Sequence, residues 1–143
     1  MTLPNKEILL AACRGFPHCI HPVLEAAGEL ADLHEQRAHA EAATTVSEID
    51  WHRARLMLQI DRWVASHAPT PSGGARLHTE TVGRIVDRIA QLCAQAYSRL
   101  ACPSDGAYED AIAALTELSW GYQDLVDEVA RGARRLPDTF DQW

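Results

Sequence analysis

The feature that most constrains the fold of this chain is one long amphipathic stretch between His78 and Leu100. Its apolar residues recur at spacings of three and four, which places them along one face of an α-helix. That face consists of Val82, Ile85, Val86, Ile89, Leu92, Cys93, Ala96, Tyr97 and Leu100. The opposite face carries Arg84, Asp87, Arg88, Gln91, Gln95 and Arg99. Thr79 is placed to cap the start of the helix, with Glu80 in its first turn.

Four further segments have helical patterns. They are a short one from Pro4 to Cys13 and three long ones, from Pro22 to about Ala43, from Thr45 to about His67, and from Asp105 or Gly106 to Arg134. Thr45 and Glu48 have the spacing of a capping box. The last segment has a heptad-like apolar seam of Tyr108, Ile112, Leu115, Ser119, Tyr122, Val126, Val129 and Ala133. The sequence therefore predicts an all-α fold, an antiparallel helical bundle of four long helices plus a short N-terminal helix.

A single domain is expected over residues 1–143. The length and the hydrophobic content of 47% suit one buried core. Within this domain, residues 1–21 would form the short helix and a connector, and residues 137–143 a tail. The segment from Ala68 to Gly74 is rich in Pro, Ser and Gly, which predicts a flexible loop.

The charge and the apolar content restrict the partners. A net charge of −7 argues against nucleic acid as a partner, and the sequence contains no basic stripe. No apolar run approaches the ~20 residues that span a bilayer, so a membrane partner is not expected. The N-terminus lacks the features of a secretory signal. We therefore expect a cytoplasmic protein in which Cys13, Cys19, Cys93 and Cys102 are reduced thiols.

The common catalytic and cofactor motifs are missing. Cys13, His18, Cys19 and His21 fall within nine positions, but their spacing matches no familiar zinc motif. No histidine has a glutamate three residues before it, which argues against a di-iron bundle. The sequence also has no nucleophile-elbow serine and no phosphate-binding loop. We expect no cofactor, no metal site and no catalytic residues, and favour a protein that is not an enzyme.

Polar residues at inward positions offer two interpretations. His34, Arg37 and Arg53 lie where a bundle normally has Leu, and buried charges require partners. Candidate partners are Glu41, Asp50, Glu80 and Asp87. One interpretation is a structural network of ion pairs that fixes the register of the helices. The other is a polar pocket that binds a small molecule, an anion or a metal ion, with His34, Arg53, Glu80, Asp87 and Arg88 as its ligand-binding residues.

Several short segments together resemble a known family. They are Leu33-His34-Glu35, Glu48-Ile49-Asp50 with Arg53 and Arg55, Ile60-Asp61-Arg62-Trp63-Val64, His78 to Gly83 and Val86 to Ile89. This succession resembles an uncharacterised bacterial family, domain of unknown function family 4254, and especially its short actinobacterial members. The resemblance covers about Pro22 to Leu136 and is strongest from Glu80 to Leu92. There the family pattern is Glu-x-x-Gly-x-x-x-Asp-Arg-Leu, and this sequence has Ile89 in place of the last residue. His52 departs from the Asn of related chains. The resemblance implies a helical bundle and supplies no catalytic residues.

The favoured hypothesis is a helical bundle that acts by protein–protein association as a homodimer. The short chain contains four tryptophans, and tryptophan is enriched at association surfaces. Trp51 and Leu58 lie on a second side of the third helix, away from Ile49 and Ile60, so we expect a two-fold dimer that buries Trp51 or Leu58. The alternative is a small-molecule or metal-ion binding protein, which could be an enzyme, that uses the inward polar cluster.

Overall fold

The computed structural model describes residues 2–101 and 106–138. Within this part the chain forms five helices and two strands of two residues each, so the predicted all-α class is confirmed. The elements are α1 (Lys6–Cys13), α2 (Pro22–His39), α3 (Ala43–His67), β1 (Arg76–Leu77), α4 (Val82–Ala101), α5 (Ala107–Ala130) and β2 (Arg134–Arg135). Cys102, Asp105 and the tail beyond Asp138 lie outside the described residues. No helix among the residues described has the length and apolarity needed to cross a bilayer.

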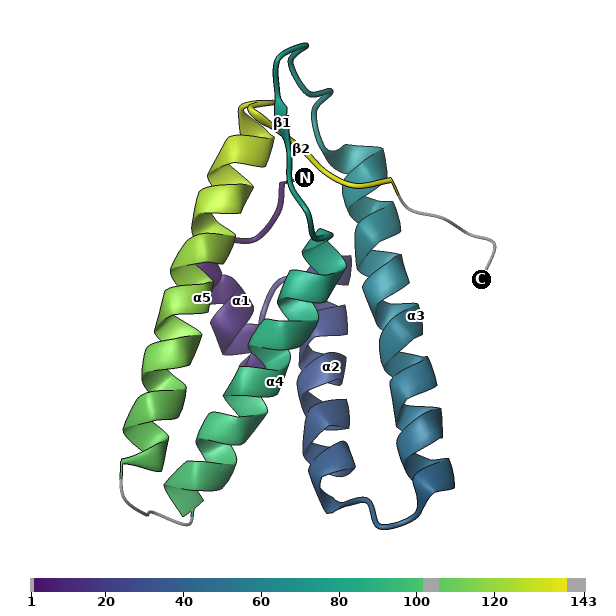
Figure 1. The fold of residues 1–143 in the computed structure, drawn as a ribbon, viewed down its shortest axis with the longest axis vertical. Coiled ribbons are helices and arrows are strands. Elements are labelled where there is room, and N and C mark those ends of the chain that lie inside the picture. Colours follow the sequence, from purple (N-terminus) through teal and green to yellow (C-terminus); the bar gives the residue numbers. More distant parts are fainter. Residues whose placement is uncertain (1, 102–105, 139–143) are drawn as a thin grey trace.

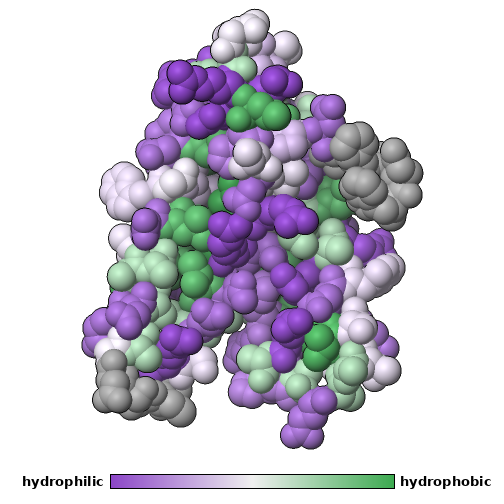
Figure 2. Space-filling model, viewed as in Figure 1, coloured by the Kyte–Doolittle hydropathy of each residue, from purple (hydrophilic) through white to green (hydrophobic). Residues whose placement is uncertain are grey.

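The long helices form two hairpins, α2–α3 and α4–α5, and α4 lies at the centre of the fold. In Figure 1 the end of α4 and the start of α5 lie at the same end of the molecule as the loop that joins α2 to α3, so consecutive long helices run in opposite directions. α4 packs against α1, α2, α3 and α5. In the described part of the chain, α5 packs against α4 and α1 but not against α2 or α3. The two hairpins separate toward the end of the molecule at which α2 and α4 end, where Figure 2 shows an open notch.

The apolar stripe of α4 supplies the centre of the core, as its spacing predicts. Val82, Ile85, Val86, Ile89, Ala90, Cys93 and Ala96 are all buried. Toward the end of the same helix the stripe becomes accessible, with Tyr97 46% and Leu100 54% exposed. Asp87 was expected on the polar face, and this is wrong, because the residue is only 8% exposed. Charged groups from the neighbouring hairpin surround its carboxylate, as described below.

Two helices begin at residues other than those predicted. α3 begins at Ala43 after Ala42, which makes no capping hydrogen bond with its side chain, so the predicted Thr45–Glu48 capping box is wrong. α4 begins at Val82, and Thr81 Oγ1 accepts a hydrogen bond from the N–H of Arg84 at 3.3 Å. Thr81 therefore caps this helix in place of Thr79, and Glu80 precedes its first turn.

The segments after α3 and α5 pair with each other. β1 and β2 are parallel, with Arg76 opposite Arg134 and Leu77 opposite Arg135. The N–H of Ser72 also donates to the carbonyl of Gly132 at 2.8 Å. The predicted continuation of the last helix to Arg134 is wrong, because α5 ends at Ala130 and Gly132 adopts a φ of 69°. These bonds connect part of the predicted loop to the end of α5.

Candidate functional site

Five charged or polar side chains from three helices form one continuous network that extends from the interior to the surface. α2 contributes His34 and Arg37, α3 contributes Asp50 and Arg53, and α4 contributes Asp87. Both His34–Arg37 and Asp50–Arg53 are three residues apart, so each pair lies on one helical face. Since the two hairpins meet along α2, α3 and α4, this arrangement places the network where the hairpins contact each other.

Asp87 accepts hydrogen bonds from two other helices. His34 Nε2 donates to Asp87 Oδ1 at 2.8 Å. Arg53 Nε donates to Asp87 Oδ1 at 3.1 Å, and Arg53 Nη2 donates to Asp87 Oδ2 at 2.6 Å. Two parallel bonds between a guanidinium and a carboxylate define both distance and orientation. The Asp87 carboxylate therefore joins α4 to both helices of the other hairpin.

The network continues from Arg53 toward the surface. Arg53 Nη1 donates to Asp50 Oδ1 at 2.7 Å. Arg37 Nε and Nη2 donate to Asp50 Oδ1 and Oδ2 at 2.8 and 3.1 Å. His34 and Asp87 are buried, Arg53 is partly buried, and the side chains of Arg37 and Asp50 are partly exposed. The two arginines and the two carboxylates carry opposite charges in equal number.

The network lowers the pKa values of both of its carboxyl groups. Burial alone would raise the pKa of Asp87, but hydrogen bonds from His34 and Arg53 outweigh this effect, and the pKa lies below its ordinary value. The hydrogen bond from Arg37 is the main cause that lowers the pKa of Asp50 to about 2. Both carboxyl groups are consequently ionised near neutral pH, as their ion pairs require.

Three of the five predicted site residues belong to this network, and two do not. His34, Arg53 and Asp87 converge as described. Glu80 and Arg88 instead form an ion pair with each other outside the buried cluster. The network also includes Arg37, which the sequence predicts as an inward arginine, and Asp50, which it predicts as a candidate partner.

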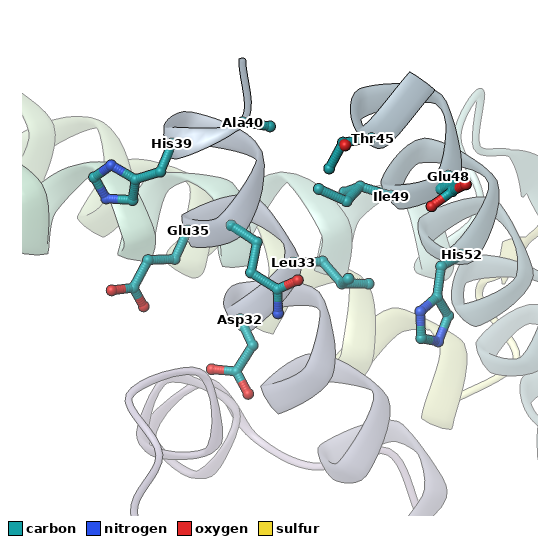
Figure 3. Close-up of a pocket in the computed structure, with 10 residues that line it drawn as sticks. Asp32, Leu33, Glu35, His39, Ala40, Thr45, Glu48, Ile49 and His52 are labelled. Carbon is teal, nitrogen blue, oxygen red and sulfur yellow. The ribbon is translucent and has the colours of Figure 1, made fainter. Parts of the chain in front are cut away.

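A shallow groove follows the α2–α3 hairpin beside the network. Two adjoining hollows of about 710 and 720 Å³ share Glu48 and His52 in their linings. In Figure 3, Leu33 and Ile49 lie between the two helices, whereas Glu35 and His39 point away from α3. His34, Arg53 and Asp87 line neither hollow. The groove therefore does not open onto the buried cluster.

The cysteines and histidines near the N-terminus have separate surroundings. His21 is buried, its Nε2 lies 2.9 Å from the carbonyl oxygen of Thr2, and its Nδ1 accepts a hydrogen bond from the N–H of Val23. His21 is therefore the N-cap of α2. Cys13 is buried whereas Cys19 is exposed. Over residues 2–101 and 106–138, no group of three potential ligands is arranged to hold a metal ion.

Asp61 and Gly83 form a second polar contact between the hairpins, which the sequence pattern did not predict. Asp61 Oδ1 on α3 accepts a hydrogen bond from the backbone N–H of Gly83 at 2.7 Å, at the start of α4. A Cβ atom on Gly83 would lie 2.4 Å from the carbonyl oxygen of Met57. Burial raises the pKa of Asp61 despite the bond from Gly83. A glycine inside a strong helical pattern was the available signal, since it indicates close backbone approach.

Comparison with known proteins identifies the family. The family model described as "Protein of unknown function (DUF4254)" matches residues 30–102, just over half of the chain. The chain belongs to this family. The resemblance seen in the sequence is thus confirmed, over a shorter range than the predicted Pro22 to Leu136. The matched region contains every residue of the buried network but not α1 or α5. A search of curated proteins and a search of solved structures each find no match.

Proposed function

We propose that this DUF4254 protein acts by association with another protein chain and forms a homodimer. The observation that carries the proposal is a set of large apolar side chains that the chain itself leaves accessible. Trp51 on α3 is 64% exposed, and Tyr97 and Leu100 near the end of α4 and Ile112 near the start of α5 are also exposed. Clustered apolar surface of this kind is typical of association sites.

The buried network supports a structural role within such a protein. Its charged groups pair with one another, and the neighbouring hollows do not include His34, Arg53 or Asp87. A pocket for a small molecule would need polar groups that face an accessible space. Association is therefore favoured over the alternative of small-molecule or metal-ion binding. The proposal includes a cytoplasmic location, which the free thiols of Cys13, Cys19 and Cys93 support.

Sedimentation equilibrium at micromolar concentrations tests the proposal. The expected result is a mass of two chains, with dissociation on dilution. A mass of one chain across the whole concentration range would refute the homodimer. Addition of a metal chelator during the same measurement should leave the mass unchanged.

A further inference from the structure

Two buried cysteines meet where α1 packs against α4. Cys13, the last residue of α1, is 7% exposed, and Cys93 on α4 is 2% exposed. A hydrogen bond joins their side chains. Cys13 Sγ also lies 3.9 Å from the carbonyl oxygen of Ala27 on α2. The fold therefore pairs Cys13 with a thiol from a distant part of the sequence, and not with the nearby Cys19, which is exposed.

A cation lies beside this thiol pair. Arg14 directly follows Cys13, and Tyr97 lies about one helical turn beyond Cys93 on α4. Arg14 Nε donates to the Tyr97 hydroxyl at 2.9 Å. The Arg14 guanidinium also lies 5.1 Å from the centre of the Phe16 ring. These contacts hold a positive charge close to Cys93.

The surroundings make the two sulfur atoms unequal. The hydrogen bond from Cys13 lowers the pKa of Cys93, and the Arg14 guanidinium adds to this effect, so that together they outweigh burial. The same hydrogen bond, together with burial, raises the pKa of Cys13. The thiolate is the nucleophilic form of cysteine, and a neighbouring cation favours it. Cys93 is therefore placed as the nucleophile of the pair, with the Cys13 thiol as its hydrogen-bond donor.

We propose that Cys13 and Cys93 form a reversible redox site, in which hydrogen peroxide converts the two thiols into a disulfide that fastens α1 to α4. The resting form is the pair of free thiols that the structure shows. Disulfides that form inside cells are usually transient and redox-sensing, so the inference agrees with the proposed cytoplasmic location. It does not depend on the proposed homodimer.

The reaction takes place in two balanced steps. The Cys93 thiolate attacks one oxygen of the peroxide, the O–O bond breaks, and the products are a sulfenic acid on Cys93 and one water molecule. The Cys13 sulfur then attacks the Cys93 sulfur, the S–O bond breaks, and the hydroxyl group leaves with the Cys13 proton as a second water molecule. Two thiols are oxidised by two electrons, and the peroxide is reduced to water. A thiol reductant reverses the reaction by exchange.

The place of α1 in the fold suits such a site. α1 has eight residues, and every residue of the following segment, residues 14–20, is exposed. A helix this short can open locally while the bundle stays folded, which gives a small oxidant access to the buried pair. α1 also lies before the region 30–102 that the family model matches, whereas Cys93 lies within it. The disulfide would therefore attach a peripheral helix to the centre of the fold.

Oxidation of the reduced full chain by hydrogen peroxide tests the inference. The variant Cys19→Ser/Cys102→Ser keeps the pair and removes the other two cysteines of the sequence. We expect a mass decrease of about 2 Da, that of two hydrogen atoms, and a peptide in which Cys13 is linked to Cys93. Dithiothreitol should reverse both changes. Amide hydrogens of α1 should exchange about tenfold more slowly in the oxidised protein, because the disulfide opposes local opening.

The activation of Cys93 has a separate test. In the same background, Arg14→Gln should form the disulfide about threefold more slowly at pH 7 and shift the pH profile of the rate upward, because the cation beside the thiolate is lost. The matched control Arg84→Gln, on α4 but nine residues before Cys93, should react like the parent variant. Far-UV circular dichroism checks that each variant is folded.

Three results would overturn the inference. The first is a folded protein whose two thiols stay unmodified in peroxide while those of the urea-unfolded chain react. The second is a gain of oxygen on either cysteine without a linked peptide. The third is α1 exchange that is the same in the oxidised and the reduced protein. An equal rate for Arg14→Gln would overturn the assignment of Cys93 as the activated thiol.

Discussion

Removal of the Asp87 carboxylate should destabilise the fold strongly, because it leaves the buried His34 and the partly buried Arg53 without their acceptor. Asp87 accepts three hydrogen bonds, two of them from Arg53 and one from His34. Removal of one member of a buried ion pair costs about 3–5 kcal/mol. Arg53 keeps its bond to Asp50, so we expect a loss near the lower limit, about 3 kcal/mol for Asp87→Ala. For a chain of this length that corresponds to roughly 10 °C in Tm.

Urea denaturation followed by far-UV circular dichroism measures this loss, with Asp50→Ala as the matched control. Asp50 has two arginine partners but is more exposed, so its removal should cost about 1 kcal/mol or less. In an Arg53→Met background, Asp87→Ala should cost about 2 kcal/mol less than it does in the native chain. Equal losses for Asp87→Ala and Asp50→Ala, or no coupling to Arg53, would refute the idea that buried charges join the hairpins.

Three other predictions concern backbone packing, pH and the core. In urea denaturation, Gly83→Ala should lower the free energy of unfolding by about 2 kcal/mol or more, because the new Cβ would meet a carbonyl oxygen of α3. The control Gly121→Ala should raise it by about 0.5–1 kcal/mol, because a Cβ at Gly121 has nothing within 4 Å. The pKa values of Asp50 and Asp87 are lower in the folded state than in the unfolded state, so these carboxylates stabilise the fold above about pH 4 and lose this effect as the pH falls toward 2. Asp50→Asn should therefore flatten this part of a plot of Tm against pH. Ile89→Asp should unfold the chain, as measured by loss of the cooperative thermal transition, since Ile89 is fully buried.

The sequence was informative wherever local periodicity determined the structure. The apolar stripe of α4 predicted its buried face, and the segments assigned to α1, α2, α3 and α5 are helical. Helix ends were less predictable, because the capping side chain depends on where the chain enters the fold. Thr45 and Glu48 have the right spacing for a cap, yet α3 begins before them at Ala43. The short β1–β2 pairing has no periodic signal in two residues per strand.

The site was predictable in its residue types but not in its geometry. His34 and Arg53 interrupt apolar stripes, and this local anomaly indicated that they face inward. Asp87 lies between polar and apolar positions on its own helix, and only the approach of α2 and α3 determines that it is buried. Glu80 lies just before α4, where the chain turns and brings it to Arg88. A helical projection of the sequence places Glu80 on the helix and therefore does not show this pair.

Hydrogen–deuterium exchange at several protein concentrations tests most directly whether a second copy of the chain covers the accessible apolar side chains. At concentrations where the native chain is dimeric, peptides that carry these side chains, either around Trp51 on α3 or from the end of α4 and the first half of α5, should exchange more slowly than in dilute protein. Peptides from the exposed segment around Gly73 provide an internal reference and should exchange at the same rate throughout. Exchange that is independent of concentration at both places would contradict the account.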